Sequence, residues 1–148
     1  MALNARPIVL SGRDIEGMSE EGFPVSGSGG NVTWKTLLSS SKTPSNTLTS
    51  GLARCAAKGG HLKCHRHDHP EMYYVVQGRG IIAIDGAEQE VSKGSVVFIP
   101  GNSEHGIRNE DEEEDLVWLY VFAADRFEDV VYRFSANPVQ AESETPDH

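Results

Sequence analysis

The amino-acid sequence predicts an all-β domain, built either as a sandwich or as a barrel. Short apolar runs are separated by glycine, proline and other turn residues at close spacing, and no long helical periodicity is present. The dipeptide Asp85-Gly86 stands between two apolar runs and is a strong signal for a two-residue hairpin. Only residues 126–129 indicate a helical turn. Many short strands joined by tight turns are typical of sandwiches and barrels.

The chain divides into an arm, a strand-rich body and a tail. Residues 1–30 end in a stretch rich in glycine and serine, which predicts a flexible N-terminal arm. Residues 137–148 are polar and contain two prolines, which predicts a disordered C-terminal tail. Residues 31–136 are expected to form the β domain. Its expected strands are 32–38, 48–57, 61–67, 71–77, 80–85, 87–91, 95–99, 105–108, 116–122 and 130–134.

Length, charge and cysteine content exclude several classes of protein. The 148 residues fit one domain. A formal net charge of −9 would be repelled by a phosphate backbone or an anionic membrane, so neither nucleic acid nor membrane is expected as a partner. No apolar run is long enough to span a bilayer, and the N-terminus lacks the apolar core of a signal peptide. Cys55 and Cys64 are therefore expected to be reduced thiols in a cytoplasmic protein.

The segment 61–71 carries the clearest chemical signal. His65 and His67 are two residues apart, so on a strand both imidazoles point to the same face. A proline then ends that strand, and Glu71 opens the next one, where an antiparallel return can place its carboxylate beside the two histidines. His105 begins another expected strand. Three imidazole nitrogens and one carboxylate that converge form a good site for one first-row divalent metal ion.

Two patterns in the chain resemble the two signature motifs of the cupin family. The first motif reads G-x5-H-x-H-x3,4-E-x6-G, and the second reads G-x5-P-x-G-x2-H-x3-N. The first is matched by Gly59, His65, His67, Glu71 and Gly78, and the second by Gly94, Pro100, His105 and Asn109. Asn102 stands where the family has a glycine; because asparagine tolerates a positive φ better than most residues, the turn is expected to survive. The resemblance covers residues 47–122, about half of the chain.

The resemblance implies an antiparallel β-barrel of the jelly-roll type with its metal ligands inside. It implies that His65, His67, Glu71 and His105 hold one divalent transition metal, with Fe preferred and Mn, Ni, Zn, Co or Cu as alternatives. A six-coordinate ion would then keep two adjacent open positions, which suit the oxygen atoms of a small-molecule substrate. Tyr73 shares the face of Glu71, and some small cupin lyases use a tyrosine at this position as general base.

Other residues near the motifs have less direct interpretations. His61 and His69 have no place in the motifs and are expected beside the ligands or at the surface. The alternating aromatic residues of 118–122, together with Tyr132, are expected to fill the core or a dimer face, with stacking on a substrate as the alternative. Cys64 has the opposite parity to the histidine ligands and is expected to face outward.

Three functions remain open at this point. The preferred one is a dioxygenase, in which O₂ attacks a small enol or diol bound to the metal. The second is a redox-neutral lyase, dehydratase or isomerase in which Tyr73 or Glu71 moves a proton. The third is a non-catalytic metal-dependent sensor, carrier or storage barrel. The fold does not decide among them, because cupins host many reactions. A homodimer is expected, in which a strand of the arm adds to the sheet edge of a neighbour.

Overall fold

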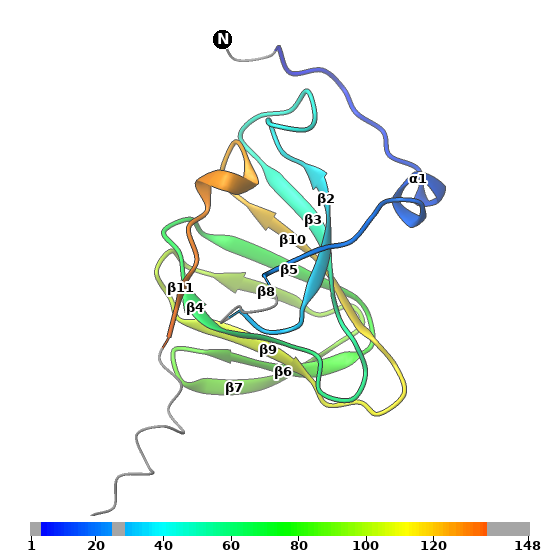
Figure 1. Cartoon of the computed structure of the whole chain (residues 1–148). Coiled ribbons are helices and arrows are strands. Elements are labelled where there is room, and N and C mark those ends of the chain that lie inside the picture. Colours follow the sequence, from blue (N-terminus) through cyan, green and yellow to red (C-terminus); the bar gives the residue numbers. More distant parts are fainter. Residues whose placement is uncertain (1–3, 25–28, 136–148) are drawn as a thin grey trace, which may run out of the picture.

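The computed structural model of the chain describes residues 4–24 and 29–135 and consists mainly of two antiparallel sheets (Figure 1). The expected tail, residues 137–148, lies outside the described residues, as do parts of the expected arm. The described residues contain two short helical segments, α1 (Gly12–Glu16) and the 3-10 helix η1 (Phe127–Asp129), the second at the predicted helical turn. No helix in this part of the chain is long and apolar enough to span a membrane.

The strands form one sheet of six strands and one of five. The first sheet contains, in spatial order, β1 (Glu21–Gly22), β2 (Thr33–Leu38), β3 (Thr49–Cys55), β10 (Leu116–Phe122), β5 (Glu71–Gln77) and β8 (Val96–Ile99). The second contains β11 (Arg133–Phe134), β4 (His61–Arg66), β9 (His105–Asn109), β6 (Arg79–Ile84) and β7 (Ala87–Ser92). Strands far apart in the sequence lie side by side, such as β3 with β10 and β4 with β9, which is the connectivity of a jelly roll.

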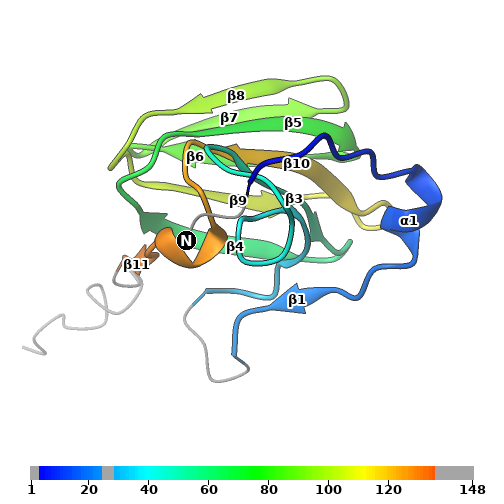
Figure 2. The ribbon, with the colours of Figure 1, turned by 90° about the horizontal axis from the view of Figure 1, so that it is seen from above.

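The jelly-roll fold is confirmed, but the strands do not close into a barrel. The two sheets can be followed from above in Figure 2, and one core of buried apolar side chains lies between them. Within residues 4–24 and 29–135, no hydrogen-bonded ladder joins an edge of one sheet to an edge of the other. The confirmed jelly roll therefore consists of two layers that are joined by side-chain packing rather than by backbone pairing.

Backbone conformation explains several turn residues of the sequence. Asp85 and Gly86 have φ values of 49° and 82°, and two positive φ values are what a type I′ hairpin turn between β6 and β7 requires. Asn102 has a φ of 67°, so the turn that the family builds with glycine survives here. Gly78 has a φ of 80°, and a Cβ there would lie 2.3 Å from the carbonyl oxygen of Asp115. Glycine is thus required at Gly78 both for backbone conformation and for space.

Strand β10 shows how alternation fills the core. Trp118, Tyr120 and Phe122 point between the sheets and are at most 5% exposed, as the prediction of core filling expects. The ring of Tyr120 lies across Gly51 on the neighbouring strand β3, where an added Cβ would be 2.1 Å from the phenol oxygen. The missing side chain of Gly51 therefore makes room for Tyr120.

Each end of the described chain adds one short strand. The sequence patterns missed the first of these strands and predicted too long a strand for the second. Strand β1 pairs with Thr33 and Trp34 of β2, inside the stretch predicted as an arm. Strand β11 pairs with His65 and Arg66 of β4, but residues 130–132 of the predicted strand lie outside any ladder. A segment becomes a strand only where it reaches a free sheet edge, and only the last two residues of this segment reach β4.

Candidate metal centre

Four side chains from the two sheets meet between the layers. His65 lies near the end of β4, His67 directly follows that strand, and His105 opens β9 of the same sheet. Glu71 opens β5 of the opposite sheet, and its Oε1 atom lies 3.3 Å from His67 Nε2 and 3.2 Å from His105 Nε2. One ring nitrogen from each histidine lies within 4.8 Å of the other two. The structure therefore brings together the four residues that the sequence spacing grouped.

Backbone carbonyl groups orient the three imidazole rings. Each Nδ1 atom lies within hydrogen-bond distance of the carbonyl oxygen of a residue two positions away. The pairs are His65 with Lys63 at 2.7 Å, His67 with His69 at 2.9 Å, and His105 with Ser103 at 2.8 Å. A carbonyl oxygen only accepts hydrogen bonds, so the neutral form of each ring would carry its proton on Nδ1. The lone pair of each Nε2 is thereby left free to bind an electrophile.

One unpaired nitrogen indicates where a cation fits. The Nε2 atom of His65 is buried and has no hydrogen-bond partner among the described residues. Burial, and to a lesser extent the neighbouring His105, together lower the pKa of His65 to about 2, so the ring is neutral at ordinary pH. Three imidazole lone pairs and one carboxylate are all acceptors, and a first-row divalent ion is the species that such a donor set accommodates. The residues present thus fit the metal that the fold family implies.

Tyr73 lies beside this cluster on strand β5. It is 2% exposed, points inward like Glu71 two residues earlier, and has its ring centroid 6.4 Å from that of His105. Burial raises the pKa of the Tyr73 phenol well above its usual value, and the charge of Glu71 raises it further. The next residue, Tyr74, points to the opposite face and is 42% exposed. Tyr73 is thus a buried phenol at the edge of the candidate metal centre.

Aromatic rings pack directly against the imidazoles. The centroid of Phe122 lies 5.1 Å from that of His67, and the centroid of Tyr132 lies 4.7 Å from that of His65. Phe134 lies 5.6 Å from His65 by the same measure. The sequence analysis expected Tyr132 in the core or at a dimer face, with stacking on a substrate as the alternative, and no local pattern separates Tyr132 from other core aromatics. Its place beside His65 depends on how the chain crosses from η1 to the edge of β4.

The segments at the two chain ends cover these rings. Phe23, next to β1, has its centroid 5.4 Å from Tyr132, 5.3 Å from Phe134 and 4.9 Å from Trp34. With this cover in place, each of the four expected ligands is at most 3% exposed. The four side chains are therefore shielded from solvent in this structure.

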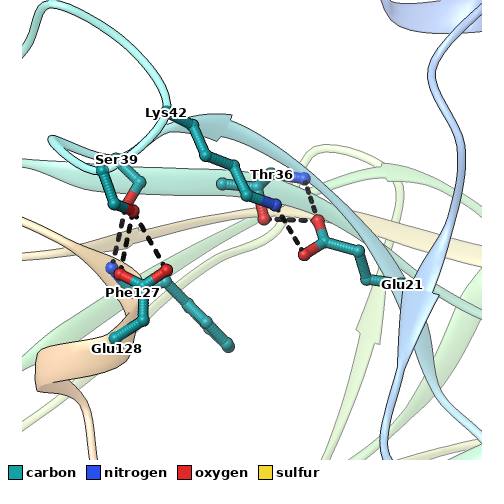
Figure 3. A network of polar contacts seen from close by, with 7 residues as sticks. Glu21, Thr36, Ser39, Lys42, Phe127 and Glu128 are labelled. Atoms are coloured by element: carbon teal, nitrogen blue, oxygen red, sulfur yellow. Dashed lines mark hydrogen bonds and ion pairs between the residues drawn. The ribbon is translucent and has the colours of Figure 1, made fainter.

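A polar network holds the covering segments to the loop between β2 and β3 (Figure 3). The carboxylate of Glu21 accepts hydrogen bonds from the backbone and side chain of Thr36 and pairs with Lys42 at 2.9 Å. Burial alone would raise the pKa of Glu21, but these hydrogen bonds and the charge of Lys42 outweigh burial and lower it. On the other side, Ser41 Oγ donates to the carboxylate of Glu128 in η1 at 2.9 Å. The arm and η1 are thus attached to the same loop.

The remaining residues singled out from the sequence do not join the cluster. The ring of His61 contacts the carbonyl oxygen of Gly59 through Nδ1 and is half-buried. His69 contributes its backbone carbonyl to the orientation of His67, which agrees with an expected place beside the ligands. Cys64 is half-buried and lines the outer side of the second sheet, and both Cys64 and Cys55 are free thiols.

Known proteins share both the sequence and the fold of this chain. Residues 54–122 match the family model of the Cupin domain. The chain is also 36% identical over 121 residues to dimethylsulfoniopropionate lyase DddW of Ruegeria pomeroyi, covering 79% of this chain and 78% of the relative. This chain belongs to the cupin superfamily.

Solved cupin structures resemble this cupin at lower identity. A cupin 2 conserved barrel domain protein from Rhodopseudomonas palustris superposes with a TM-score of 0.65 at 20% identity, over 83% of this chain and 79% of that one. A chain from a structure of the DMSP lyases RdDddP and RnDddQII superposes with a TM-score of 0.66 at 18% identity, over 80% of this chain and 63% of that one. At such identities the likeness establishes the fold.

Proposed function

We propose that this cupin is a metal-dependent lyase that acts on a small carboxylate carrying a cationic leaving group, of the dimethylsulfoniopropionate class. The observation that carries the proposal is a convergent cluster of three histidines in a chain 36% identical to a lyase of that name. Glu71 completes the cluster with a carboxylate 3.2 Å from His105. We assign the metal to His65, His67, Glu71 and His105.

The reaction is a β-elimination that needs no oxidant or reductant. In a propionate with a dimethylsulfonio group on C3, a base removes a proton from C2. The electron pair of the C2–H bond forms the C2–C3 double bond, and the C3–S bond breaks with its electron pair leaving on sulfur. The products are dimethyl sulfide, propenoate and one proton, so atoms and charges balance.

The residues of the site have distinct roles in this proposal. A bound divalent ion would supply a Lewis acid for the carboxylate of the substrate. Tyr73, buried on the same face of β5 as Glu71, accepts the C2 proton as the phenolate and becomes the neutral phenol, which then releases the proton to solvent. The position of Tyr73 supports this role, whereas the protein alone raises the pKa of its phenol. A cation bound beside Glu71 would lower that pKa. Glu71, the alternative base of the sequence analysis, is assigned to the metal because its Oε1 faces two imidazoles.

The aromatic cover suits the cationic end of such a substrate. Phe122, Tyr132 and Phe134 place rings within 5.6 Å of the imidazole centroids. A desolvated cation over an aromatic face gains about 1–2 kcal/mol, and a sulfonium has no proton to donate, so a ring face is a suitable partner for it. The same cover excludes water, which strengthens electrostatic interactions inside the site.

The dioxygenase preferred in the sequence analysis gains no support from these relatives. The curated relative that covers most of this chain is a lyase, and elimination consumes no O₂. The lyase alternative of the sequence analysis is therefore the one we propose. A non-catalytic metal-binding barrel is the alternative that the same experiment separates from it.

The test is a product assay under nitrogen. Purified protein is loaded in parallel with Fe, Mn, Ni, Zn, Co or Cu and incubated with dimethylsulfoniopropionate. We expect dimethyl sulfide in the headspace and propenoate in solution in equal amounts, with no dependence on added O₂. In deuterium oxide, propenoate formed by a simple elimination keeps its C3 hydrogens undeuterated.

Two outcomes would overturn the proposal. Consumption of O₂ coupled to loss of substrate would replace the lyase by a dioxygenase. Absence of turnover with every ion, in protein that holds one ion per chain, would leave a binding barrel. The variant His105→Ala serves as the control for background elimination by free metal.

A further inference from the structure

Two buried hydrogen-bond donors between the sheets have no partner. The indole Nε1 of Trp34 and the phenol oxygen of Tyr120 are buried atoms without a hydrogen-bond partner among the described residues. Trp34 is 8% exposed and Tyr120 is 5% exposed. A buried donor that stays unpaired destabilises the folded protein, so such groups are rare in native structures and call for an explanation. The roles proposed above use neither of these two donors.

The strand register brings the two donors to one part of the inner face of the first sheet. Tyr120 of β10 is paired with Gly51 of β3, and its phenol oxygen lies over Gly51, 2.1 Å from the position of an added Cβ. Trp34 of β2 is paired with Ala53, the next inward-facing residue of β3. Diagonal neighbours on one face of a ladder are within reach of aromatic side chains. Trp34 and Tyr120 therefore flank the same stretch of β3, where the inward-facing residues are small.

Phenylalanine rings pack around these donors. Phe127 of η1 has its centroid 5.5 Å from that of Trp34 and 6.3 Å from that of Tyr120, so one ring packs on both residues. Phe23 also packs on Trp34, with the centroids 4.9 Å apart. A phenyl ring has no oxygen or nitrogen acceptor, so these neighbours satisfy neither the indole N–H nor the phenol O–H. Both donors are thus left for a bound molecule.

The electrostatic surroundings keep Tyr120 a donor. Thr36 of β2 gives its hydroxyl proton to the carboxylate of Glu21, so this proton is already engaged (Figure 3). Burial raises the pKa of the Tyr120 phenol, and the charges of Glu21 and Glu71 raise it further. The phenol is therefore protonated at ordinary pH, and the electrostatic field around its oxygen is negative. A molecule that accepts this proton in a hydrogen bond gains more if its acceptor carries no negative charge.

We propose that Trp34 and Tyr120 form a second subsite, which binds a neutral acceptor oxygen, such as a carbonyl or hydroxyl oxygen, of the ligand held by the histidine cluster. Two donors that flank one space suit one oxygen, because an oxygen acceptor has two lone pairs. The phenylalanine rings suit the apolar carbon atoms that carry this oxygen. The subsite explains why the protein retains two buried donors that stabilise nothing within the described residues.

The position of this subsite relates it to the candidate metal centre. Phe122 has its centroid 5.4 Å from that of Tyr120 and 5.1 Å from that of His67, so one ring packs on a residue of each place. Tyr120 is also paired with Tyr73 in the ladder between β10 and β5, on the same inner face. A ligand that lies over Tyr73 therefore has the histidines toward one end and the two donors toward the other.

This inference narrows the class of ligand. It rests on the proposed function for the carboxylate end, which faces the histidine cluster, and it adds a requirement at the far end. Dimethylsulfoniopropionate has no neutral acceptor oxygen there. We therefore expect a small carboxylate that carries such an oxygen to bind more tightly than a carboxylate of the same shape without it, because only the first pairs with the two donors.

The test compares two ligands of the same shape on protein loaded with Zn. They are 4-oxopentanoate and 4-methylpentanoate, which share the carboxylate and the chain length, but only the first carries a neutral acceptor oxygen. Heteronuclear NMR follows the indole N–H groups. The chain has two tryptophans, and Trp34→Phe identifies the signal of Trp34. We expect 4-oxopentanoate to shift the Nε1 proton of Trp34 downfield, as a new hydrogen bond does, and 4-methylpentanoate to cause no downfield shift.

Tyr120→Phe tests the second donor and retains the ring. We expect this variant to bind 4-oxopentanoate about 10-fold more weakly, the effect of one lost hydrogen bond, and to bind 4-methylpentanoate as the wild type does. Titration calorimetry measures both Kd values. Tyr74→Phe, the same change on the outward face of β5, is the control and should keep both affinities. Without ligand, the urea midpoint of Tyr120→Phe should be no lower than that of the wild type, because the lost hydroxyl has no partner.

Three results would each overturn the subsite. They are equal binding or no binding of the two ligands, a Trp34 signal that 4-oxopentanoate does not move downfield, and a Tyr120→Phe variant with a lowered urea midpoint and an unchanged Kd. None of these measurements needs turnover. Release of dimethyl sulfide without a preference for 4-oxopentanoate would retain the lyase and remove the subsite. The preference without any release of dimethyl sulfide would retain the subsite and remove the lyase.

Discussion

The carboxylate oxygen Oε1 of Glu71 lies 3.2 Å from Nε2 of His105, and this contact bridges the two sheets at the candidate metal centre. Glu71 opens β5 of one sheet and His105 opens β9 of the other. Two acceptors at this distance, both buried, need a shared proton or a shared cation between them. The stacking of the sheets therefore brings the proposed ligands together, and substitutions at these positions test the proposal directly.

We expect His105→Ala to lose the metal, because it removes one of four donors and leaves a cavity in the coordination sphere. Inductively coupled plasma mass spectrometry of protein purified without added metal should find close to one ion per chain in the wild type and none in the variant. His61→Ala is the control, since His61 contacts Gly59 rather than the cluster. Full occupancy in His105→Ala would show that the assigned ligands are not the metal site.

We expect Tyr73→Phe to retain the metal and to lose kcat by about 100-fold or more, the scale of a missing general base. The phenol hydroxyl is removed, while the ring that packs against Trp118 at 5.3 Å stays in place. Steady-state kinetics of dimethyl sulfide release measure the effect. Tyr74→Phe, the same change on the outward face of β5, should keep the wild-type rate. Unchanged kcat in Tyr73→Phe would remove this residue from the mechanism.

We expect Gly51→Ala to destabilise the fold by about 1–3 kcal/mol, the usual cost of an added methyl group in a packed core. The new Cβ would lie 2.1 Å from the Tyr120 phenol oxygen and 2.7 Å from the carbonyl oxygen of Lys35. Urea unfolding followed by circular dichroism gives the difference in free energy. Gly12→Ala is the comparison, because a Cβ there meets no atom within 4 Å. Equal unfolding midpoints for Gly51→Ala and wild type would contradict the packing described for Tyr120.

We expect the stability to fall on acidification, with Asp115 as one source. Hydrogen bonds from the backbone N–H of Ala57 and from the guanidinium of Arg54 lower the pKa of Asp115 from its usual 3.8. Because the folded-state pKa is the lower one, this stabilisation is present above pH 3.8 and is lost as pH falls through the folded value. Glu21 contributes in the same direction from its usual 4.5.

The measurement is the urea midpoint as a function of pH. Asp115→Asn should lower the midpoint near neutral pH and flatten its decline on acidification. Glu112→Gln removes a charge from the same loop, and Glu112 is exposed to solvent, so the urea midpoint of this variant should decline with pH as in the wild type. A wild-type slope in Asp115→Asn would exclude Asp115 as a source of the pH dependence.

Strand positions were largely predictable because the pattern that encodes them is local. Alternation and turn residues place β5 and β10 with the bounds that the sequence predicted, and Asp85-Gly86 forms the expected hairpin turn. The predicted strand over residues 130–134 was too long, because pairing depends on which free edge the segment reaches. Whether the two sheets share a ladder in the described residues was not predictable for a similar reason, since it depends on contacts between edges far apart in the sequence.

The sequence by itself determined the two faces of each strand and the spacing of the motif, and therefore which four side chains are candidates for one metal. Only the tertiary structure decided that Glu71 reaches His67 and His105 from the opposite sheet, that Tyr132 packs on His65, and that Phe23 covers them. Among the described residues, it also decided that β1 pairs with β2 and that β8 pairs with β5. The physical reason is that local sequence sets the direction of a side chain, whereas its neighbours depend on how the sheets stack and where the connections cross.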